Sequence, residues 1–365
     1  MLTNIKIILL SIKIKFFKLL RKNYDPFGYN INSFFFSPSY FLLDENFKKE
    51  NIFQLVDIDK ERNEKNKLKT ILNLKKSKNN LNILKKVNFE INKNLKRNRI
   101  IFKYSKFIDF PIDVITKNNT KYKAIVICLQ GANSGAHINY NKVLMPNDYK
   151  KVKNGGGHAI YAALNNCIGV SYERIGYGER REKIIRSKFK NTATYNIDPS
   201  LNFLLFGRTL LGQTIDEIDS LVDFLKIEYG NLPVYIMGYS DGGTIAMAYA
   251  AVKDNINGIA ISGCIGYFKD TILKRTQTGL LNIPNFLKYF DTNTFFELSV
   301  PKYCLIVSGT NDHIWPYKLT KKVIDDVEAK NKNNNINLIK VEGGHTYYPD
   351  VMWKNLIKHI DSNQY

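Results

Sequence analysis

The chain has 365 residues, of which 44% are hydrophobic, enough to bury the core of one large domain or a little more. Its formal net charge is +21, from 54 Lys and Arg against 33 Asp and Glu, and such an excess would ordinarily indicate nucleic acid or an anionic membrane as the partner. The excess is nearly all lysine, accompanies abundant Asn, Ile, Phe and Tyr, and clusters only in the first hundred residues. We therefore expect no nucleic-acid partner.

The N-terminal stretch from Leu2 to Leu20 is apolar but interrupted by lysines, and its longest uncharged run, Ile7 to Ile12, is far below the ~20 residues of a membrane span. No small-residue cleavage site follows, so the pattern predicts neither a transmembrane helix nor a signal peptide. Two interpretations remain for residues 1–22. We favour a helix that docks onto its own protein, because apolar residues occur nearly all round it; the alternative is weak contact with a membrane surface.

Residues 1–95 are rich in Lys and Asn and poor in strand signal, which predicts a helical N-terminal extension. A second unit is expected over residues 96–365, where two runs, Ile100 to Tyr104 and Ile112 to Ile115, are typical of paired strands. Six short apolar runs then alternate with helical stretches, which predicts an α/β fold with a mostly parallel sheet and helices on both faces. These runs are Ala124 to Leu129, Cys167 to Tyr172, Val234 to Met237, Gly258 to Ser262, Tyr303 to Val307 and Ile336 to Val341.

Two features between these runs complete the organisation. Apolar residues at helical spacing predict a helix from Thr214 to Tyr229, ended by Gly230 and Pro233. Residues 267–300 interrupt the alternation, and we expect an insertion there that lies over the carboxyl edge of the sheet.

Four cysteines lie in or beside the apolar runs: Cys128, Cys167, Cys264 and Cys304. They form no C-x-x-C pair and no dense disulfide framework, so we expect free, packed thiols in a reducing compartment. The sequence therefore favours a cytoplasmic protein, with peripheral membrane contact left open, and predicts no metal and no cofactor.

The strongest chemical signal is the turn Gly238-Tyr239-Ser240-Asp241-Gly242, which follows an apolar strand and precedes a helix of small residues. A sharp strand-to-helix turn can raise a serine Oγ clear of the sheet. Such a turn is sterically possible where the residues two before and two after the serine are glycines. The pattern predicts Ser240 as a nucleophile of the α/β-hydrolase type.

A serine nucleophile needs a base and an orienting carboxylate. Asp312 follows one predicted strand and His345 follows the next, after two glycines, and the chain order Ser, Asp, His is that of α/β-hydrolases. The rival histidines are His137, His158, His313 and His359; of these, His359 lies in the predicted terminal helix and His313 directly follows the proposed acid. Asp270 and Asp291 are weaker candidates for the acid, because no strand delivers them to the sheet edge.

An oxyanion hole requires two backbone N–H groups, one of them from the residue after the nucleophile, which is Asp241. The second is expected in the loop from Leu129 to His137. We assign it to Ala132, with Asn133 as the alternative.

These motifs resemble those of the bacterial dienelactone hydrolase and acetyl xylan esterase-like α/β-hydrolases. The likeness spans about residues 100–360 and rests on Cys128 to His137, Tyr172 to Arg181, Gly238 to Gly243, and Ser308 to Pro316 with Gly343 to His345. It implies hydrolysis of a small carboxylic ester by a triad of Ser240, Asp312 and His345, with the turn from Gln130 to Ala132 at the oxyanion site.

Two departures and one loop qualify the resemblance. Dienelactone hydrolase itself uses a cysteine where this chain has Ser240, which favours ester chemistry. Many relatives have His-Gly in place of Gln130-Gly131. Within the second motif, Arg174 and Glu179 are expected to brace the loop rather than to touch substrate.

Two alternative functions remain. A peptidase of the prolyl-oligopeptidase type shares the fold and the triad order, but such enzymes usually carry a large propeller that the N-terminal segment is too short and too helical to form. The other alternative is a non-catalytic hydrolase-fold protein that binds at a membrane surface through its basic N-terminus. That function predicts a broken triad, whereas the sequence contains a complete one.

Overall fold

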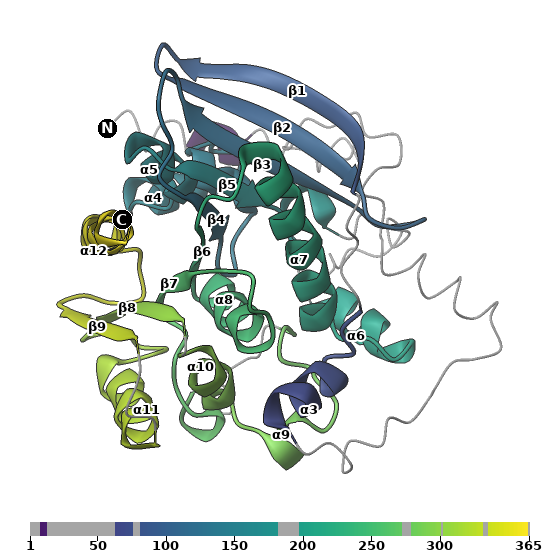
Figure 1. Cartoon of the computed structure of the whole chain (residues 1–365), viewed down its shortest axis with the longest axis vertical. Coiled ribbons are helices and arrows are strands. Elements are labelled where there is room, and N and C mark those ends of the chain that lie inside the picture. The colour runs from purple at the N-terminus through teal and green to yellow at the C-terminus, as the bar shows by residue number, and fades with distance from the viewer. Residues whose placement is uncertain are drawn as a thin grey trace.

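The computed structural model describes residues 8–12, 63–75, 81–181, 197–271, 279–300, 302–330 and 335–363. Within these residues, nine strands form one sheet in the order β1-β2-β3-β5-β4-β6-β7-β8-β9 (Figure 1). The strands are β1 (Asn82–Asn92), β2 (Leu95–Lys103), β3 (Asp109–Lys117), β4 (Ile125–Leu129), β5 (Ile168–Tyr172), β6 (Val234–Tyr239), β7 (Gly258–Ser262), β8 (Tyr303–Gly309) and β9 (Ile336–Val341).

The six strands from β5 and β4 through β9 are parallel, and β1, β2 and β3 pair in antiparallel fashion at one end. The predicted α/β class and all six predicted runs are confirmed. The runs are continuously apolar because both sides of each strand are covered. In β4, Ile125 and Ile127 face one hydrophobic core, whereas Val126 and Cys128 face the other.

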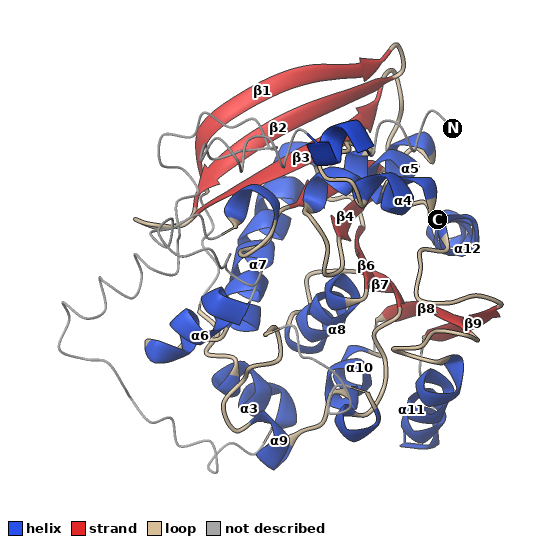
Figure 2. Cartoon of the chain, turned by 180° about the vertical axis from the view of Figure 1, so that it is seen from behind, coloured by secondary structure: helices blue, strands red, loops and turns tan. Residues whose placement is uncertain are grey.

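Helices cover both faces of the sheet (Figure 2). The larger core includes residues of α7, α8, α10 and α11, and the smaller core includes residues of α5 and α12. The helices are α3 (Glu64–Ile71), α4 (Asp148–Lys153), α5 (His158–Leu164), α6 (Ile197–Leu205), α7 (Leu210–Tyr229), α8 (Asp241–Val252), α9 (Phe286–Tyr289), α10 (Asn293–Ser299), α11 (Tyr317–Lys330) and α12 (Pro349–Ser362), with short 3-10 turns η2 (Ala136–Tyr140), η3 (Gly178–Arg180) and η5 (Phe268–Asp270).

Helix α7 begins four residues before the predicted start. The hydroxyl of Thr209 accepts a hydrogen bond from the N–H of Gly212, 2.9 Å away, and so caps the first turn. The prediction used only the spacing of apolar residues, which does not reveal a cap, so it placed the start of the helix too late.

The prediction of a helical segment up to about residue 95 is wrong for residues 82–92, which form β1. All its side chains except that of Val87 are exposed, and the strand is held by antiparallel pairing with β2. Val87, Phe89 and Ile91 alternate with polar residues as in a strand, but the Lys and Asn around them match the composition on which the helical prediction rests. Helix α3, at residues 64–71, does lie within the predicted helical region.

Only residues 8–12 of the predicted N-terminal helix are described. They are helical, and Ile8, Leu9 and Ile12 are more than half exposed. The choice between docking and membrane contact for residues 1–22 therefore depends largely on residues outside the described part. Within the described ranges, no helix has the length and apolar content needed to cross a bilayer.

The segment expected as an insertion, residues 267–300, is the crossover between β7 and β8. Its helix α10 packs against α8, and the rings of Phe286 and Phe295 stack with centroids 5.1 Å apart in the larger core. The four cysteines of the chain are free and buried, as predicted.

The strand order reverses direction next to β4. The chain continues from β4 to β5 on one side, and then returns to β6 on the other side of β4. In open α/β sheets the crevice at the carboxyl ends of such neighbouring strands is the usual binding position. Here the loop after β4 and the turn containing Ser240 meet at this point.

Candidate active site

Ser240 lies in the turn between β6 and α8 with φ 54° and ψ −122°, a conformation that residues other than glycine rarely adopt. Its N–H donates to the carbonyl of Ser262 at 2.9 Å. The two flanking glycines are required by space, since a Cβ at Gly238 would lie 2.2 Å from the carbonyl oxygen of Gly242, and one at Gly242 would lie 2.3 Å from that of Leu129. Backbone atoms therefore approach these two positions too closely for any residue with a side chain.

The structure brings His345 and Asp312 to this serine. Nε2 of His345 lies 3.2 Å from Oγ of Ser240, and Nδ1 lies 2.8 Å from Oδ2 of Asp312. Each ring nitrogen thus faces a different partner. Gly263 leaves the space for the ring, because a Cβ at that position would lie 2.9 Å from Cε1 of His345.

Asp312 is 4% exposed, and its other oxygen, Oδ1, accepts hydrogen bonds from the backbone N–H groups of Ile314 and Trp315, both at 2.8 Å. Burial alone would raise the pKa of Asp312. The hydrogen bonds from His345 and from these N–H groups outweigh burial and hold the pKa below its usual value. The group is therefore a carboxylate at neutral pH, with one oxygen fixed by the backbone and the other aimed at the imidazole.

Two tyrosines that the sequence analysis did not single out support the histidine. The ring of Tyr239 packs against that of His345 with centroids 4.8 Å apart, and against that of Tyr347 at 4.4 Å. Tyr239 precedes the serine and Tyr347 follows the histidine by two residues, so their positions beside the motifs were the available signal.

None of the rival residues takes the place of His345 or Asp312 beside Ser240. His359 stacks on Tyr303 with centroids 3.5 Å apart, and His158 is buried against Tyr347. The ring centroid of His313 is 6.1 Å from that of His345. Among the competing acids, Asp291 accepts hydrogen bonds from the N–H groups of Phe268 and Thr292, and Asp270 lies in η5.

His137 belongs to a second group of the same residue types, which we call the Asp148 cluster: Ser134, His137 and Asp148. Nε2 of His137 lies 2.8 Å from Oδ2 of Asp148 and 3.3 Å from Oγ of Ser134, and the Ser134 hydroxyl also donates directly to Asp148. Asp148 is fully buried and accepts from the N–H groups of Leu144 and Met145 at 2.9 and 2.7 Å. The cluster holds the loop before α4 in place.

The residues expected at the oxyanion site lie next to Ser240. Asp241 is the first residue of α8, so its N–H has no partner within the helix and contributes to the helix's positive end. On the other side, a Cβ at Gly131 would lie 3.0 Å from Cβ of Ser240, which places the loop after β4 against this serine. Ala132 in this loop is exposed, and Asn133 is buried.

The side chain of Gln130 is fully engaged within the protein. Its Nε2 donates to Oδ1 of Asn139 at 2.6 Å and to the carbonyl of Gly156 at 2.8 Å, and its Oε1 accepts from Tyr347 at 2.7 Å and from Asn133 at 2.8 Å. These bonds tie the loop after β4 to three other segments. The amide of Gln130 therefore sets the shape of the loop.

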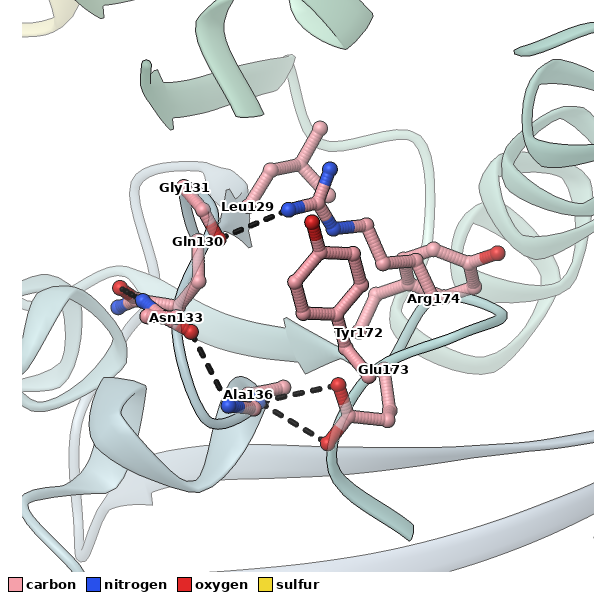
Figure 3. Close-up of a pocket in the computed structure, with 10 residues that line it drawn as sticks. Leu129, Gln130, Gly131, Asn133, Ala136, Tyr172, Glu173 and Arg174 are labelled. Carbon is pink, nitrogen blue, oxygen red and sulfur yellow. Dashed lines mark hydrogen bonds between the residues drawn. The ribbon is translucent and has the colours of Figure 1, made fainter. Parts of the chain in front are cut away.

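The loop after β5, residues 173–181, is pinned by buried charged side chains to several elements around the site. Arg180 and Glu217 of α7 form a fully buried ion pair at 2.7 Å, and Glu179 pairs with Arg99 of β2. Arg174 reaches the loop after β4, where its Nη2 donates to the carbonyl of Gly131 at 2.8 Å (Figure 3). The expectation that Arg174 and Glu179 brace this loop agrees with these contacts.

Glu173 in the same loop faces η2 rather than Ser240. Its two carboxyl oxygens accept the N–H of Ala136 at 3.1 and 3.0 Å (Figure 3). Burial, reinforced by nearby Glu179, raises the pKa of Glu173 to about 8. Figure 3 draws the small pocket that Glu173 lines together with Gln130, Gly131 and Arg174.

Comparison with known proteins identifies solved structures of similar fold. No family model matches the chain, and no curated protein matches it. A glucuronoyl esterase from Solibacter usitatus superposes with a TM-score of 0.60 at 11% identity, over 86% of this chain and 95% of that one. Acetyl xylan esterase 1 from Thermoanaerobacterium sp. gives 0.51 at 14% identity, over 83% and 93% of the two chains.

A glucuronoyl esterase from Teredinibacter turnerae gives a TM-score of 0.55 at 10% identity, over 78% of this chain and 79% of that one. All three are named as ester hydrolases, and the superpositions cover most of each chain. Together with the sheet order and the serine turn, they confirm that this chain has the α/β-hydrolase fold.

Proposed function

We propose that this chain is a serine hydrolase that cleaves a small carboxylic ester. The observation that carries the proposal is the hydrogen-bonded line through His345, with one ring nitrogen 3.2 Å from Oγ of Ser240 and the other 2.8 Å from Asp312. In this arrangement the imidazole can accept the proton of the serine and later donate it to the leaving group. A Ser-His-Asp triad performs this chemistry in unrelated folds.

The reaction follows from these positions. Nε2 of His345 accepts the proton of Ser240 as Oγ attacks the ester carbonyl, and then gives it to the leaving alcohol, so that an acyl-enzyme remains on Ser240. The same nitrogen next activates a water that releases the acid. Asp312 orients the ring and stabilises the imidazolium formed in both steps. Activity therefore requires a neutral His345.

The oxyanion formed in each step would be bound by the N–H of Asp241 and by that of Ala132, with the N–H of Asn133 as the alternative. Gln130 contributes by fixing the shape of this loop through its four hydrogen bonds. Loss of one such donor should cost roughly 3 kcal/mol of transition-state stabilisation.

Ester rather than peptide substrates are supported by two observations. The sequence motifs resemble those of acetyl xylan esterase-like hydrolases, and the similar solved structures are named as acetyl xylan and glucuronoyl esterases.

The buried, free cysteines also support a cytoplasmic location. The membrane-bound, non-catalytic function is not supported, because it would not require the line through His345.

The test uses a fluorophosphonate probe and p-nitrophenyl acetate with three proteins: wild type, Ser240→Ala and Ser134→Ala. We expect labelling and turnover by wild type and by Ser134→Ala, and neither by Ser240→Ala. Ser134 is a matched control, because it is also a serine beside a histidine and an aspartate. Absence of Ser240-dependent labelling and turnover would refute the proposal, and faster cleavage of peptide anilides than of esters would indicate the peptidase.

A further inference from the structure

The residue after the nucleophile carries a charge that conflicts with the proposed reaction. Asp241 would offer its N–H to the oxyanion, yet its carboxylate stands at the same end of α8. The N-terminus of a helix carries a partial positive charge that stabilises a nearby anion. The carboxylate of Asp241 offsets this positive charge and so weakens the stabilisation available to the oxyanion. A second negative charge close to the developing one also repels it, most strongly in a buried site.

Arg174 contacts this carboxylate and the facing loop at once. Its Nη1 lies 3.3 Å from Oδ2 of Asp241, and its Nη2 donates to the carbonyl of Gly131 at 2.8 Å. The guanidinium carbon lies 3.8 Å from the centroid of the Tyr177 ring, and the hydroxyl of Tyr177 also donates to Asp241, at 3.4 Å. The side chains of Arg174 and Asp241 are no more than 10% exposed, so water screens their interaction weakly.

We propose that Arg174 is a positioning residue for ester hydrolysis, which neutralises Asp241 beside the oxyanion site and joins the two segments that supply the oxyanion donors. The inference rests on the proposed function of Ser240. Gly131 and Ala132 belong to one segment, and Ser240 and Asp241 belong to the other. Arg174 is therefore placed to keep the site both positively charged and correctly spaced.

The two roles of Arg174 predict different behaviour on substitution. A hydrogen bond to Gly131 can be made by several polar side chains, whereas neutralisation of Asp241 requires a positive charge. Lysine retains the charge but lacks the two-pronged guanidinium that reaches both partners. Removal of the carboxylate as well as the guanidinium should restore the charge balance without restoring the bond to Gly131.

The experiment compares kcat and KM for p-nitrophenyl acetate in Arg174→Gln, Arg174→Lys, Asp241→Asn and the double variant Arg174→Gln with Asp241→Asn. We expect Arg174→Gln to lower kcat by roughly tenfold to a hundredfold with little change in KM, because the effect falls on the transition state. Arg174→Lys should lie between it and wild type. The double variant should recover most of the lost kcat, and Asp241→Asn alone should have a higher kcat than Arg174→Gln.

Thermal unfolding of each variant separates this outcome from a loss of packing. If the double variant is as slow as Arg174→Gln, or if Arg174→Gln has the wild-type kcat, the inference is wrong. Its failure is distinguishable from failure of the proposed function, because the latter requires that wild type itself shows no Ser240-dependent turnover. If Arg174→Gln does not fold, Arg174→Lys and Asp241→Asn still decide the matter: a kcat of Asp241→Asn well below that of Arg174→Lys contradicts charge neutralisation.

Discussion

Two groups of serine, histidine and aspartate lie in this molecule, and they differ in which atoms meet. In the first, Oγ of Ser240 and the carboxylate of Asp312 approach opposite nitrogens of His345. In the Asp148 cluster, the serine and the aspartate approach the same nitrogen, Nε2 of His137, and the serine also donates directly to Asp148.

This difference determines what each group can do. A proton can pass from serine to imidazole only if the carboxylate leaves that nitrogen open and fixes the other one. In the Asp148 cluster the carboxylate occupies the nitrogen that faces the serine. The proposed catalytic site and the structural cluster thus contain the same residue types, and they differ in which nitrogen of the histidine each partner contacts.

The sharpest test of the comparison removes the charge of each aspartate in turn. Asp312→Asn should lower kcat by roughly 10³-fold to 10⁴-fold, since the amide favours the wrong tautomer of His345 and cannot stabilise the imidazolium. The measurement is kcat for p-nitrophenyl acetate, with thermal unfolding as the check on folding. A folded Asp312→Asn variant with wild-type kcat would remove Asp312 from the proposed triad.

Asp148→Asn should act on stability instead. Asp148 is fully buried and accepts hydrogen bonds from two backbone N–H groups, a serine and a histidine. The amide cannot accept all of them, so we expect a loss of about 2 to 3 kcal/mol in the free energy of unfolding, measured with urea. Below the unfolding transition, kcat should stay near the wild-type value. A folded variant that has lost its activity would contradict the structural role.

A smaller effect concerns acid. His158 is fully buried against Tyr347, and its ring nitrogens have no hydrogen-bond partner within the described residues. Burial lowers the pKa of His158 to about 4. The unfolded chain therefore binds a proton here before the folded one does, and the stability that neutral His158 allows is lost as the pH falls from about 6.5 towards 4, by roughly 3 kcal/mol at most.

His158→Phe should lose less stability than wild type between pH 7 and pH 4.5, as measured by urea unfolding at each pH. Any loss of activity that follows from acid unfolding should accordingly move to lower pH in this variant. Equal pH dependence in the two proteins would show that His158 is not the group that titrates.

The sequence predicts the central sheet and the line through His345 because both depend on local patterns. The six parallel strands are buried on both faces, so each is a run of apolar residues, and Asp312 and His345 each follow such a run. By contrast, β1 has no buried face. The role of Gln130 and the contact between Arg174 and Asp241 depend on segments that are far apart in the chain. No pattern in the sequence indicates that these segments lie side by side.

Ser240 also has a consequence for how this protein could evolve. A serine held at φ 54° and ψ −122° stores strain of about 1 to 3 kcal/mol that glycine at the same position would not. Selection for stability alone would therefore favour glycine over the serine that the proposed reaction requires. A serine at this position of the turn therefore gives up stability for the reactivity that we propose for it.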